Sequence, residues 1–492
     1  MKKKNIQKYI LILDFIIIYL CAIKLFAQAN PVSEMEHYLE NGQTAKAQEL
    51  LDSSKDKDYY NKLQNLNYFY TGRYSEALAA LKDEKYVFQR MVMKNHLEKL
   101  VEITKDFKEY DLGHFVLRLK QQDLVLKDIL ATSLEKIYSV IGSEFNFYPQ
   151  DKVIIEFYPT KEEFAFASTL GDETLERSGA IGICKFNRIM LVSPVALPQG
   201  YRWIDSVCHE YVHFAVNRKT VGKCPLWLHE GTARYHDTLW RSNPPVYITP
   251  GNVNVLVDAL NNDKMISFKR MSPSLVYLKD QDEVNLAFVE VSNSVEFMNK
   301  KYKGKLQKIL ENLKQQEENQ SFKSAIGMDI NKFESKWKEY LKKSGLKKTD
   351  GALADKINWH KVNEIDEFVG VNVRDYLRLG DRFKKGGNIM VALIQYEKAL
   401  SMEPYNPVVL YRKSRVLISQ NKIEEAMKAA VLCVENNPNY VSGFELAGEL
   451  CLVKGENEKA AKYLREALEM NPYNQFTVEN YQKAKAAIAN KP

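Results

Sequence analysis

A period of 34 residues near the C-terminus places the strongest constraint on what this chain can fold into. Four columns of mostly small residues keep this spacing: Pro404, Pro438 and Pro472; Ala392, Ala426 and Ala460; Gly380, Ser414 and Gly448; and Gly387, Asn421 and Gly455. Small side chains allow paired helices to approach closely, and proline ends a helix. We therefore predict three helical hairpins over residues 373–490, which must stack because no single hairpin can bury its apolar face alone.

The spacing and the four columns resemble the tetratricopeptide (TPR) repeat over three units. That resemblance implies a concave surface for a protein partner. A weaker echo lies nearer the N-terminus, where Gly42–Ala47 and Gly72–Ala77 repeat the five-residue offset of Gly387–Ala392. We expect two TPR-like hairpins within residues 30–109, with an ordinary helical hairpin as the alternative.

The N-terminus has the layout of a secretory signal peptide. Basic residues 2–4 precede a mostly apolar stretch from Tyr9 to Ile23, and Ala27-Gln28-Ala29 supplies a small-x-small cleavage site. We predict that residues 1–29 are removed and that the protein is exported, to the periplasm or the extracellular space. The alternative is an uncleaved anchor, and only then is the membrane a partner.

Charge and cysteine content exclude some functions. Residues 1–29 carry five lysines and one aspartate, so their removal lowers the formal net charge from +7 to +3. So small a surplus gives no electrostatic reason to expect nucleic acid as a partner. The sequence has no Cys-x-x-Cys pair, so a thiolate zinc cluster is not expected. One disulfide among Cys184, Cys208 and Cys224 is possible, and the sequence does not say which two residues would form it.

The middle of the chain carries the candidate chemistry. Two apolar runs, Val153–Tyr158 and Arg188–Val192, predict strands. A predicted helix from Trp203 to Asn217 then contains His209-Glu210-Tyr211-Val212-His213, an HExxH motif. Residues four apart share one face of a helix, so both imidazoles can bind one ion, and imidazole suits Zn²⁺. Glu210 lies about 100° around the helix, where it can act as a general base on water.

A third ligand is predicted downstream of the motif. Glu230 lies in Trp227-Leu228-His229-Glu230-Gly231, which reads as a helix entered through Pro225 with an apolar pair that can pack inward. Two histidines and one glutamate leave a fourth position open on zinc, as catalytic zinc sites do. His229 is the alternative ligand, although neighbouring helical positions diverge by about 100°.

HExxH together with the downstream Trp-Leu-x-Glu-Gly-x-Ala resembles the gluzincin metallopeptidases, the peptidase MA-like group related to thermolysin. The resemblance spans about residues 110–345. It implies an α+β fold: a thermolysin-like metallopeptidase domain flanked by α-helical TPR-type hairpins, mostly helical overall. It implies that zinc is held by His209, His213 and Glu230, with Glu210 as the base. It also implies that Gly179–Val192 is the edge strand along the cleft and that Ala287–Lys305 is a helix.

The sequence departs from that group at one place. Many relatives carry Tyr-x-x-Ser near the start of the later helix, where this chain has Phe288 and Val291. In related peptidases a hydroxyl or imidazole often stabilises the oxyanion, and losing such a donor costs roughly 10²–10³ in rate. Tyr235, Tyr247 and Tyr277 are candidate replacements.

Three neighbours of the motif have simpler interpretations. We expect Cys208 to be a small buried residue and His236 to lie at the surface or behind the ligands. Asp205 precedes His209 by four residues. It is either an orienting partner for that ring or an exposed carboxylate.

These observations predict an exported zinc-dependent peptidase that hydrolyses a peptide or protein substrate. The TPR repeats would recruit that substrate or a partner protein, and residues 346–372 are predicted to be a linker. The alternative is a TPR interaction scaffold whose peptidase-like domain is weakly active or inactive. A purely structural zinc site is disfavoured by the three-ligand set.

Overall fold

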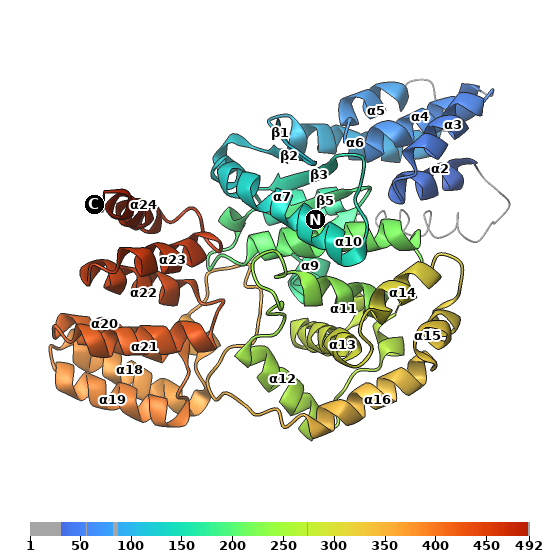
Figure 1. Ribbon diagram of the computed structural model, residues 1–492. Helices are drawn as coiled ribbons and strands as arrows, with labels where there is room; N and C mark the ends of the chain where they lie inside the picture. Colours follow the sequence, from blue (N-terminus) through green and yellow to red (C-terminus); the bar gives the residue numbers. More distant parts are fainter. Residues whose placement is uncertain (1–30, 56, 82–86, 273, 491–492) are drawn as a thin grey trace, which may run out of the picture. The chain divides into compact units, whose positions relative to one another are not determined.

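The computed structural model describes residues 31–55, 57–81, 87–272 and 274–490 (Figure 1). The predicted signal peptide, residues 1–29, lies outside the described residues. The chain divides into two compact units, one from residues before 106 together with 185–188, the other from 106–184 and 189–492. Across the described residues, no helix has both the length and the apolar character that a membrane span requires.

The first unit is built from helical hairpins. Its helices are α2 (Pro31–Glu40), α3 (Thr44–Ser53), α4 (Lys57–Tyr70), α5 (Tyr74–Ala80) and α6 (Val87–Thr104). The turns between α2 and α3 and between α4 and α5 pass through Gly42 (φ +63°) and Gly72 (φ +71°). Glycine suits both positions because it adopts positive φ without strain. Ala47 and Ala77, which follow these turns, are buried.

A five-stranded mixed sheet opens the second unit. Its strands are β1 (Lys108–Leu112), β2 (Phe115–Leu119), β3 (Val153–Tyr158), β4 (Gly182–Lys185) and β5 (Arg188–Val192), in the spatial order β1-β2-β3-β5-β4. β1 and β2 are antiparallel, with Lys108 opposite Leu119, whereas β2 and β3 are parallel, with Phe115 opposite Val153. Every residue of β5 is buried, as expected of an interior strand covered on both faces.

The expected single edge strand over Gly179–Val192 is wrong in one respect. The chain turns back at Phe186 (φ +54°) and Asn187 (φ +59°), so the segment forms a hairpin of two short strands. Two successive residues with positive φ are the mark of the type I′ turn, whose twist matches that of a hairpin. Of the two strands in this hairpin, β4 lies at an edge of the sheet and β5 lies inside it.

Helices supply the rest of the domain. They are α7 (Val125–Phe145), α8 (Lys161–Ser168), α9 (Asp172–Ser178), α10 (Trp203–Thr220), α11 (Leu226–His236), α12 (Pro250–Asn261), α13 (Gln281–Lys301), α14 (Lys305–Asn312), α15 (Glu318–Ile326) and α16 (Ile330–Lys343). α10 is buried along most of its length and contacts α7, α11 and α14. α13 begins earlier than the expected Ala287, because the Asp280 side chain caps it by accepting from the Glu283 amide.

The repeats form the C-terminal part of the second unit. Their helices are α17 (Glu364–Phe368), α18 (Val371–Lys385), α19 (Ile389–Met402), α20 (Pro407–Ser419), α21 (Ile423–Asn436), α22 (Val441–Val453), α23 (Asn457–Leu468) and α24 (Gln475–Ala489). Residues 371–489 are called the repeat array below. The predicted class, α+β and mostly helical overall, is confirmed.

Each column of the period has a physical role in the array. Gly387, Asn421 and Gly455 turn the chain inside each hairpin, at φ of +79°, +57° and +71°. Ala392, Ala426 and Ala460 are fully buried between helices. A Cβ at Gly448 would lie 2.5 Å from Cγ of Leu464, so only glycine allows the observed approach of α22 and α23.

The segment between α16 and α17, residues 344–363, is called the connecting segment. It is extended and held by side-chain amides: Asn254 of α12 accepts from the Thr349 amide (2.8 Å) and donates to the Thr349 carbonyl (2.9 Å). Gln281 makes the same pair of bonds with Ile357 (3.2 and 3.1 Å). The predicted linker over 346–372 therefore contains ordered chain, together with α17 and the start of α18.

The array also contacts the residues that lead into α10. The amide of Tyr201 donates to the Met470 carbonyl (3.1 Å). Arg202 forms an ion pair with Glu466 (2.6 Å) and donates to the Pro438 carbonyl (2.6 Å). Pro438 and Met470 lie in or beside the loops that separate successive repeats, so this edge of the array faces the domain that carries HExxH.

Candidate metal centre

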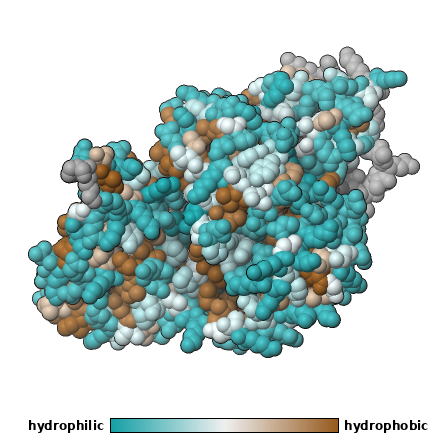
Figure 2. Space-filling model, in the orientation of Figure 1, coloured by the Kyte–Doolittle hydropathy of each residue, from teal (hydrophilic) through white to brown (hydrophobic). Residues whose placement is uncertain are grey.

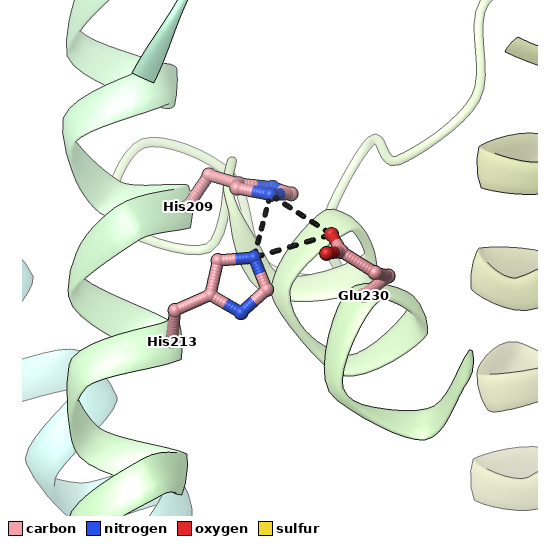
Figure 3. A group of neighbouring side chains, drawn as sticks. All are labelled: His209, His213 and Glu230. Carbon is pink, nitrogen blue, oxygen red and sulfur yellow. Dashed lines mark hydrogen bonds and ion pairs between the residues drawn. The ribbon is translucent and has the colours of Figure 1, made fainter. Parts of the chain in front are cut away.

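Three side chains from two helices converge at the predicted ligand positions (Figure 3). His209 and His213 project from successive turns of α10, and Glu230 projects toward them from α11. His213 Nε2 lies 3.1 Å from His209 Nε2 and 3.2 Å from Glu230 Oε2, and His209 Nε2 lies 3.7 Å from Glu230 Oε2. Within the described residues, these three form the group of side chains close enough together to hold a metal ion.

The spacing of these three atoms fits a small tetrahedral cation. Ligand atoms about 2.0–2.1 Å from a tetrahedral zinc are about 3.3 Å apart from one another. The three observed distances, 3.1, 3.2 and 3.7 Å, lie around that value. The side chains of His209, His213 and Glu230 are 15%, 10% and 18% exposed, so the group is open to a substrate without being solvated on all sides.

Packing of α11 explains how Glu230 reaches the two histidines. The predicted inward pair is confirmed, because Trp227 and Leu228 are buried, and the Trp227 indole stacks on Phe268 at 4.1 Å. A Cβ at Gly231 would lie 2.6 Å from the Val291 carbonyl oxygen. Because Gly231 has no side chain, α11 can lie directly against α13. This packing sets the position of the Glu230 carboxylate relative to α10.

Glu210, on the same helix as the two histidines, lies beside strand β4. A Cβ at Gly182 would lie 2.8 Å from Glu210 Oε1, so this carboxylate lies directly beside the edge strand. Burial raises the pKa of Glu210 to about 7, against the opposing effect of His213 and of a backbone hydrogen bond at Cys184. A carboxylate with a pKa near neutrality can both accept and return a proton, which general acid–base catalysis requires.

The charges of the ligand group favour an ionised Glu230. Burial opposes ionisation, but the neighbouring imidazoles of His213 and His209 outweigh it and hold the pKa of Glu230 well below its usual range. Burial lowers the pKa of His209 to about 4, so that ring is neutral at pH 7. A neutral imidazole and an ionised carboxylate are the forms that bind a metal.

A carboxylate that sequence reasoning missed lies behind His209. Asp237 follows α11, and its Oδ2 lies 4.0 Å from His209 Nδ1, the nitrogen that points away from the ligand group. Ligating histidines commonly donate this second ring N–H to a carboxylate. Asp237 comes seven residues after Glu230, two helical turns further on the same face, and that spacing was the available signal.

The other neighbours of the motif have structural roles. His229 Nε2 donates to the His213 carbonyl (3.2 Å), and its ring packs on the His213 ring, so it lies outside the ligand group. Cys208 is buried as expected. His236, the last residue of α11, is buried, with Nδ1 2.7 Å from the Thr232 carbonyl.

Asp205 matches neither expectation from the sequence. It is buried, and it accepts from Trp240 Nε1 (2.9 Å) and from Arg241 through two bonds (2.8 and 2.7 Å). Asp205 therefore links α10 to the residues that follow α11. The carboxylate near the ring of His209 is that of Asp237. All five cysteines after residue 29 are free, so the possible disulfide among Cys184, Cys208 and Cys224 is not formed.

Phe288, which we expect to stand in place of a tyrosine of many related peptidases, lies close to the ligand group. Its ring lies 6.1 Å from that of His209 and offers no hydrogen-bond donor. Of the candidate replacements, Tyr247 is buried with its hydroxyl accepting from Asn293 (3.0 Å), and Tyr235 packs on Tyr247 at 5.1 Å. Tyr277 is 72% exposed. Tyr277 is thus the candidate whose side chain is open to solvent.

Comparison with known proteins yields two kinds of likeness. Residues 148–343 match the family model of the Peptidase MA superfamily. The TPR repeat-containing thioredoxin TTL4 of Arabidopsis thaliana is 31% identical over 91 residues, 17% of this chain and 13% of that protein. DnaJ homolog subfamily C member 3 of Bos taurus is 25% identical over 104 residues, 21% of this chain and 21% of that protein. The chain therefore spans about a fifth or less of these relatives.

Solved structures of TPR domains are also similar. The first TPR of Spaghetti (RPAP3), bound to an HSP90 peptide, is 24% identical, with a TM-score of 0.24 over 25% of this chain and 98% of that one. The Sgt2 TPR domain from Aspergillus fumigatus is 17% identical, with a TM-score of 0.24 over 25% of this chain and 87% of that one. The family match and the TPR-containing relative give this chain a peptidase MA-like domain together with TPR repeats.

Proposed function

We propose that the peptidase MA-like domain is a zinc-dependent peptidase in which His209, His213 and Glu230 hold the metal and Glu210 is the general base. The observation that carries this proposal is the triangle of two imidazole nitrogens and one carboxylate oxygen, 3.1–3.7 Å on a side, beside the buried Glu210. Two histidines and a glutamate form a set with one open position, which a catalytic zinc requires and a structural zinc does not.

The chain's own residues account for the proton transfers. Zinc bound by the three ligands supplies a Lewis acid that acidifies water and polarises a carbonyl oxygen. Glu210 takes the proton from the attacking water and returns it to the leaving amine. Its position beside β4 suits this role, because β4 is one of the two edge strands of the sheet and can pair with an extended peptide through backbone hydrogen bonds. Such pairing holds the scissile bond near Glu210.

The array suits recruitment of a protein substrate or partner. Its loops between repeats contact the domain that carries HExxH, at Pro438 and Met470. Apolar residues appear on the visible surface of the array in Figure 2, and Val371, Met390 and Ile394 are each more than half exposed. Exposed apolar groups of this kind favour a protein partner.

A second candidate function rests on Phe288. If no other group stabilises the oxyanion, the domain binds zinc and peptide without useful hydrolysis, and the protein is a TPR scaffold. The 6.1 Å contact between the Phe288 and His209 rings favours this candidate. The retained Glu210, buried beside β4, favours the peptidase.

Metal content tests the first part of the proposal. We expect about one zinc per purified chain by inductively coupled plasma mass spectrometry, and loss of zinc in His213→Ala. Glu210→Gln should keep its zinc, because Glu210 lies outside the ligand triangle. A chain that holds no zinc even after reconstitution would refute the peptidase.

Activity separates the two candidates. Unfolded proteins and peptides are incubated with the parent chain, with Glu210→Gln and with a chelator. We expect hydrolysis by the parent and a loss of at least about 100-fold in Glu210→Gln. Zinc binding without hydrolysis of any substrate would favour the scaffold.

We also propose that the chain is exported, on the basis of residues 1–29 alone. N-terminal sequencing of the protein recovered from outside the cytoplasm should then begin at Asn30. Recovery of the whole protein with Met1 in the cytoplasm would refute export.

A further inference from the structure

Arg234 holds the carboxylate that lies behind His209. It follows Glu230 by one turn of α11, and its Nη1 donates to Asp237 Oδ2 at 3.0 Å. Asp237 is buried, and its Oδ1 makes no hydrogen bond within the described residues. The orientation of this carboxylate toward His209 Nδ1 therefore depends on the guanidinium of Arg234.

Asp355 of the connecting segment accepts a hydrogen bond from the second terminal nitrogen of the same guanidinium. Arg234 Nη2 donates to Asp355 Oδ2 at 2.8 Å. Asp355 is itself held by Asn252 of α12, which donates to Oδ2 (2.8 Å) and accepts from the Asp355 amide (3.0 Å). The planar fork of arginine fits two carboxylates at once, so fixing one of them helps to orient the other.

The repeat array supplies the last contact. Asn439 donates through Nδ2 to Asp355 Oδ1 at 2.6 Å. It lies in the loop between α21 and α22, beside Pro438, which accepts from Arg202 at the start of α10. Hydrogen bonds thus join the array to Asp355, Arg234 and Asp237, and Asp237 Oδ2 lies 4.0 Å from His209 Nδ1.

The charge of this cluster complements a cation at the ligand triangle. Three carboxylates, from Asp205, Asp237 and Asp355, meet two guanidinium groups, from Arg234 and Arg241. The cluster carries at most one excess negative charge, and it lies on the Nδ1 side of His209. Removing one of these charges changes the field at that ring.

We propose that Asp355 and Arg234 are positioning residues that aim Asp237 at His209, so that the connecting segment and the repeat array set the affinity of the metal site. This inference rests on the proposed metal site. It assigns the segment between the two domains a part in the chemistry, since partners behind a ligand typically change metal affinity by 10–100-fold.

The test compares zinc affinity in the full chain, measured by competition with a chromophoric chelator. We expect Asp355→Asn to weaken zinc binding about 10-fold and to change the visible spectrum of the Co²⁺-substituted chain, because His209 is held less firmly. Asn439→Ala should weaken binding by a smaller factor. It truncates an exposed side chain, so it keeps the test valid even if Asp355→Asn folds poorly.

Glu364→Gln is the matched control. Glu364 also follows the connecting segment and accepts from Tyr440 of the array (3.2 Å), but it does not contact Arg234. We expect its zinc affinity and Co²⁺ spectrum to equal those of the parent. Unfolding temperatures of the metal-free variants show whether either substitution acts through stability alone.

Two results would overturn the inference. One is zinc affinity in Asp355→Asn and Asn439→Ala within about two-fold of the parent. The other is an equal loss in Glu364→Gln, which would indicate a general loosening of the array. A parent chain that binds no zinc refutes the proposed function and this inference together, whereas a zinc-binding parent with unaffected variants refutes only the inference.

Discussion

The repeat array and the domain that holds α10 and α11 are both largely helical, but they place their important residues by different means. In the array each helix packs on the next one in the chain, and each column recurs after 34 residues. In the metal domain, His209, Glu230, Asp237 and Asp355 come from three separate segments. The packing of the array can be predicted from the sequence because it recurs with a fixed period. A site assembled from distant segments leaves no such period in the sequence.

The two regions also differ in how they treat charge. The metal domain buries Asp205 and Asp237 and must satisfy them with Arg241 and Arg234. The array keeps its ion pairs near the surface, as in Arg415–Glu449, where the side chains are 40% and 32% exposed. Buried charges cost free energy and fix geometry, while exposed pairs contribute little. Substitutions should therefore act differently in the two regions.

The largest effect is expected at the core that supports Glu230. Trp227→Ala removes an indole that stacks on Phe268 and donates to Glu318 (2.7 Å), so it should destabilise the domain by about 3–5 kcal/mol. It should also weaken zinc binding, because α11 loses its anchor. Calorimetry and zinc competition measure the two effects.

Leu464→Ala provides the comparison in the array. This fully buried leucine packs at the position of Gly448, and its truncation should cost about 2–5 kcal/mol. Hydrogen exchange should then increase in α22 and α23, with zinc affinity within about two-fold of the parent. A larger loss of zinc affinity in Leu464→Ala than in Trp227→Ala would contradict the division drawn between the regions.

How far the sequence could predict the molecule follows the same division. The period predicted the hairpins of the array, and apolar runs predicted β3 and β5 with their observed bounds. The HExxH spacing and the downstream motif predicted the three side chains that the structure brings together. Each of these patterns lies within one short segment of the sequence: a repeat, a strand, or one of the two neighbouring helices α10 and α11.

The features that were missed depend on tertiary contacts. Asp205 was expected to be exposed or to face His209, but Trp240 and Arg241 bind it in the fold. The parts played by Arg234 and Asp355 require a contact across 121 residues of sequence. The β4–β5 hairpin is an exception, because Asn187 is a residue type that favours the left-handed turn seen there and was available as a local signal.

The next effect concerns a buried carboxylate on α13. Burial raises the pKa of Glu290 to about 8, although it accepts from the Ile266 amide (3.0 Å). Its unfolded pKa is about 4.3. Between these values the unfolded chain has lost a proton that the folded chain keeps, so stability falls as pH rises through that window. Glu290→Gln removes this titration, so its gain in stability over the parent should grow by about 4 kcal/mol between pH 4 and pH 8.

Unfolding curves recorded from pH 4 to pH 9 check this prediction. The difference between Glu290→Gln and the parent should grow until about pH 8 and then stay constant. Leu464→Ala should shift the curves by the same amount at every pH, because it removes only apolar contacts. A gain in Glu290→Gln that does not depend on pH would show that Glu290 is ionised throughout in the folded protein.

A smaller effect distinguishes two kinds of glycine in the array. Gly448→Ala places a Cβ 2.5 Å from Leu464 and should cost about 1–3 kcal/mol through overpacking. Gly455→Ala meets no atom within 4 Å, but at φ +71° it should cost about 1 kcal/mol through backbone strain. Asn421 occupies the equivalent position at φ +57°, so Gly455→Asn should cost less than Gly455→Ala. Equal costs for Ala and Asn at this position would argue against strain.

The smallest effect is expected at the surface of the array. Glu449→Gln removes the 2.8 Å ion pair with Arg415, which joins α20 to α22, and should cost no more than about 0.5 kcal/mol. The cost should fall by more than half in 1 M salt, because screening shortens the range of the attraction to about 3 Å, close to the length of this pair. A double-mutant cycle with Arg415→Gln isolates the pair from other changes. A coupling that survives high salt would mean that the array, like the metal domain, depends on geometrically fixed charge, since screening does not remove such a contribution.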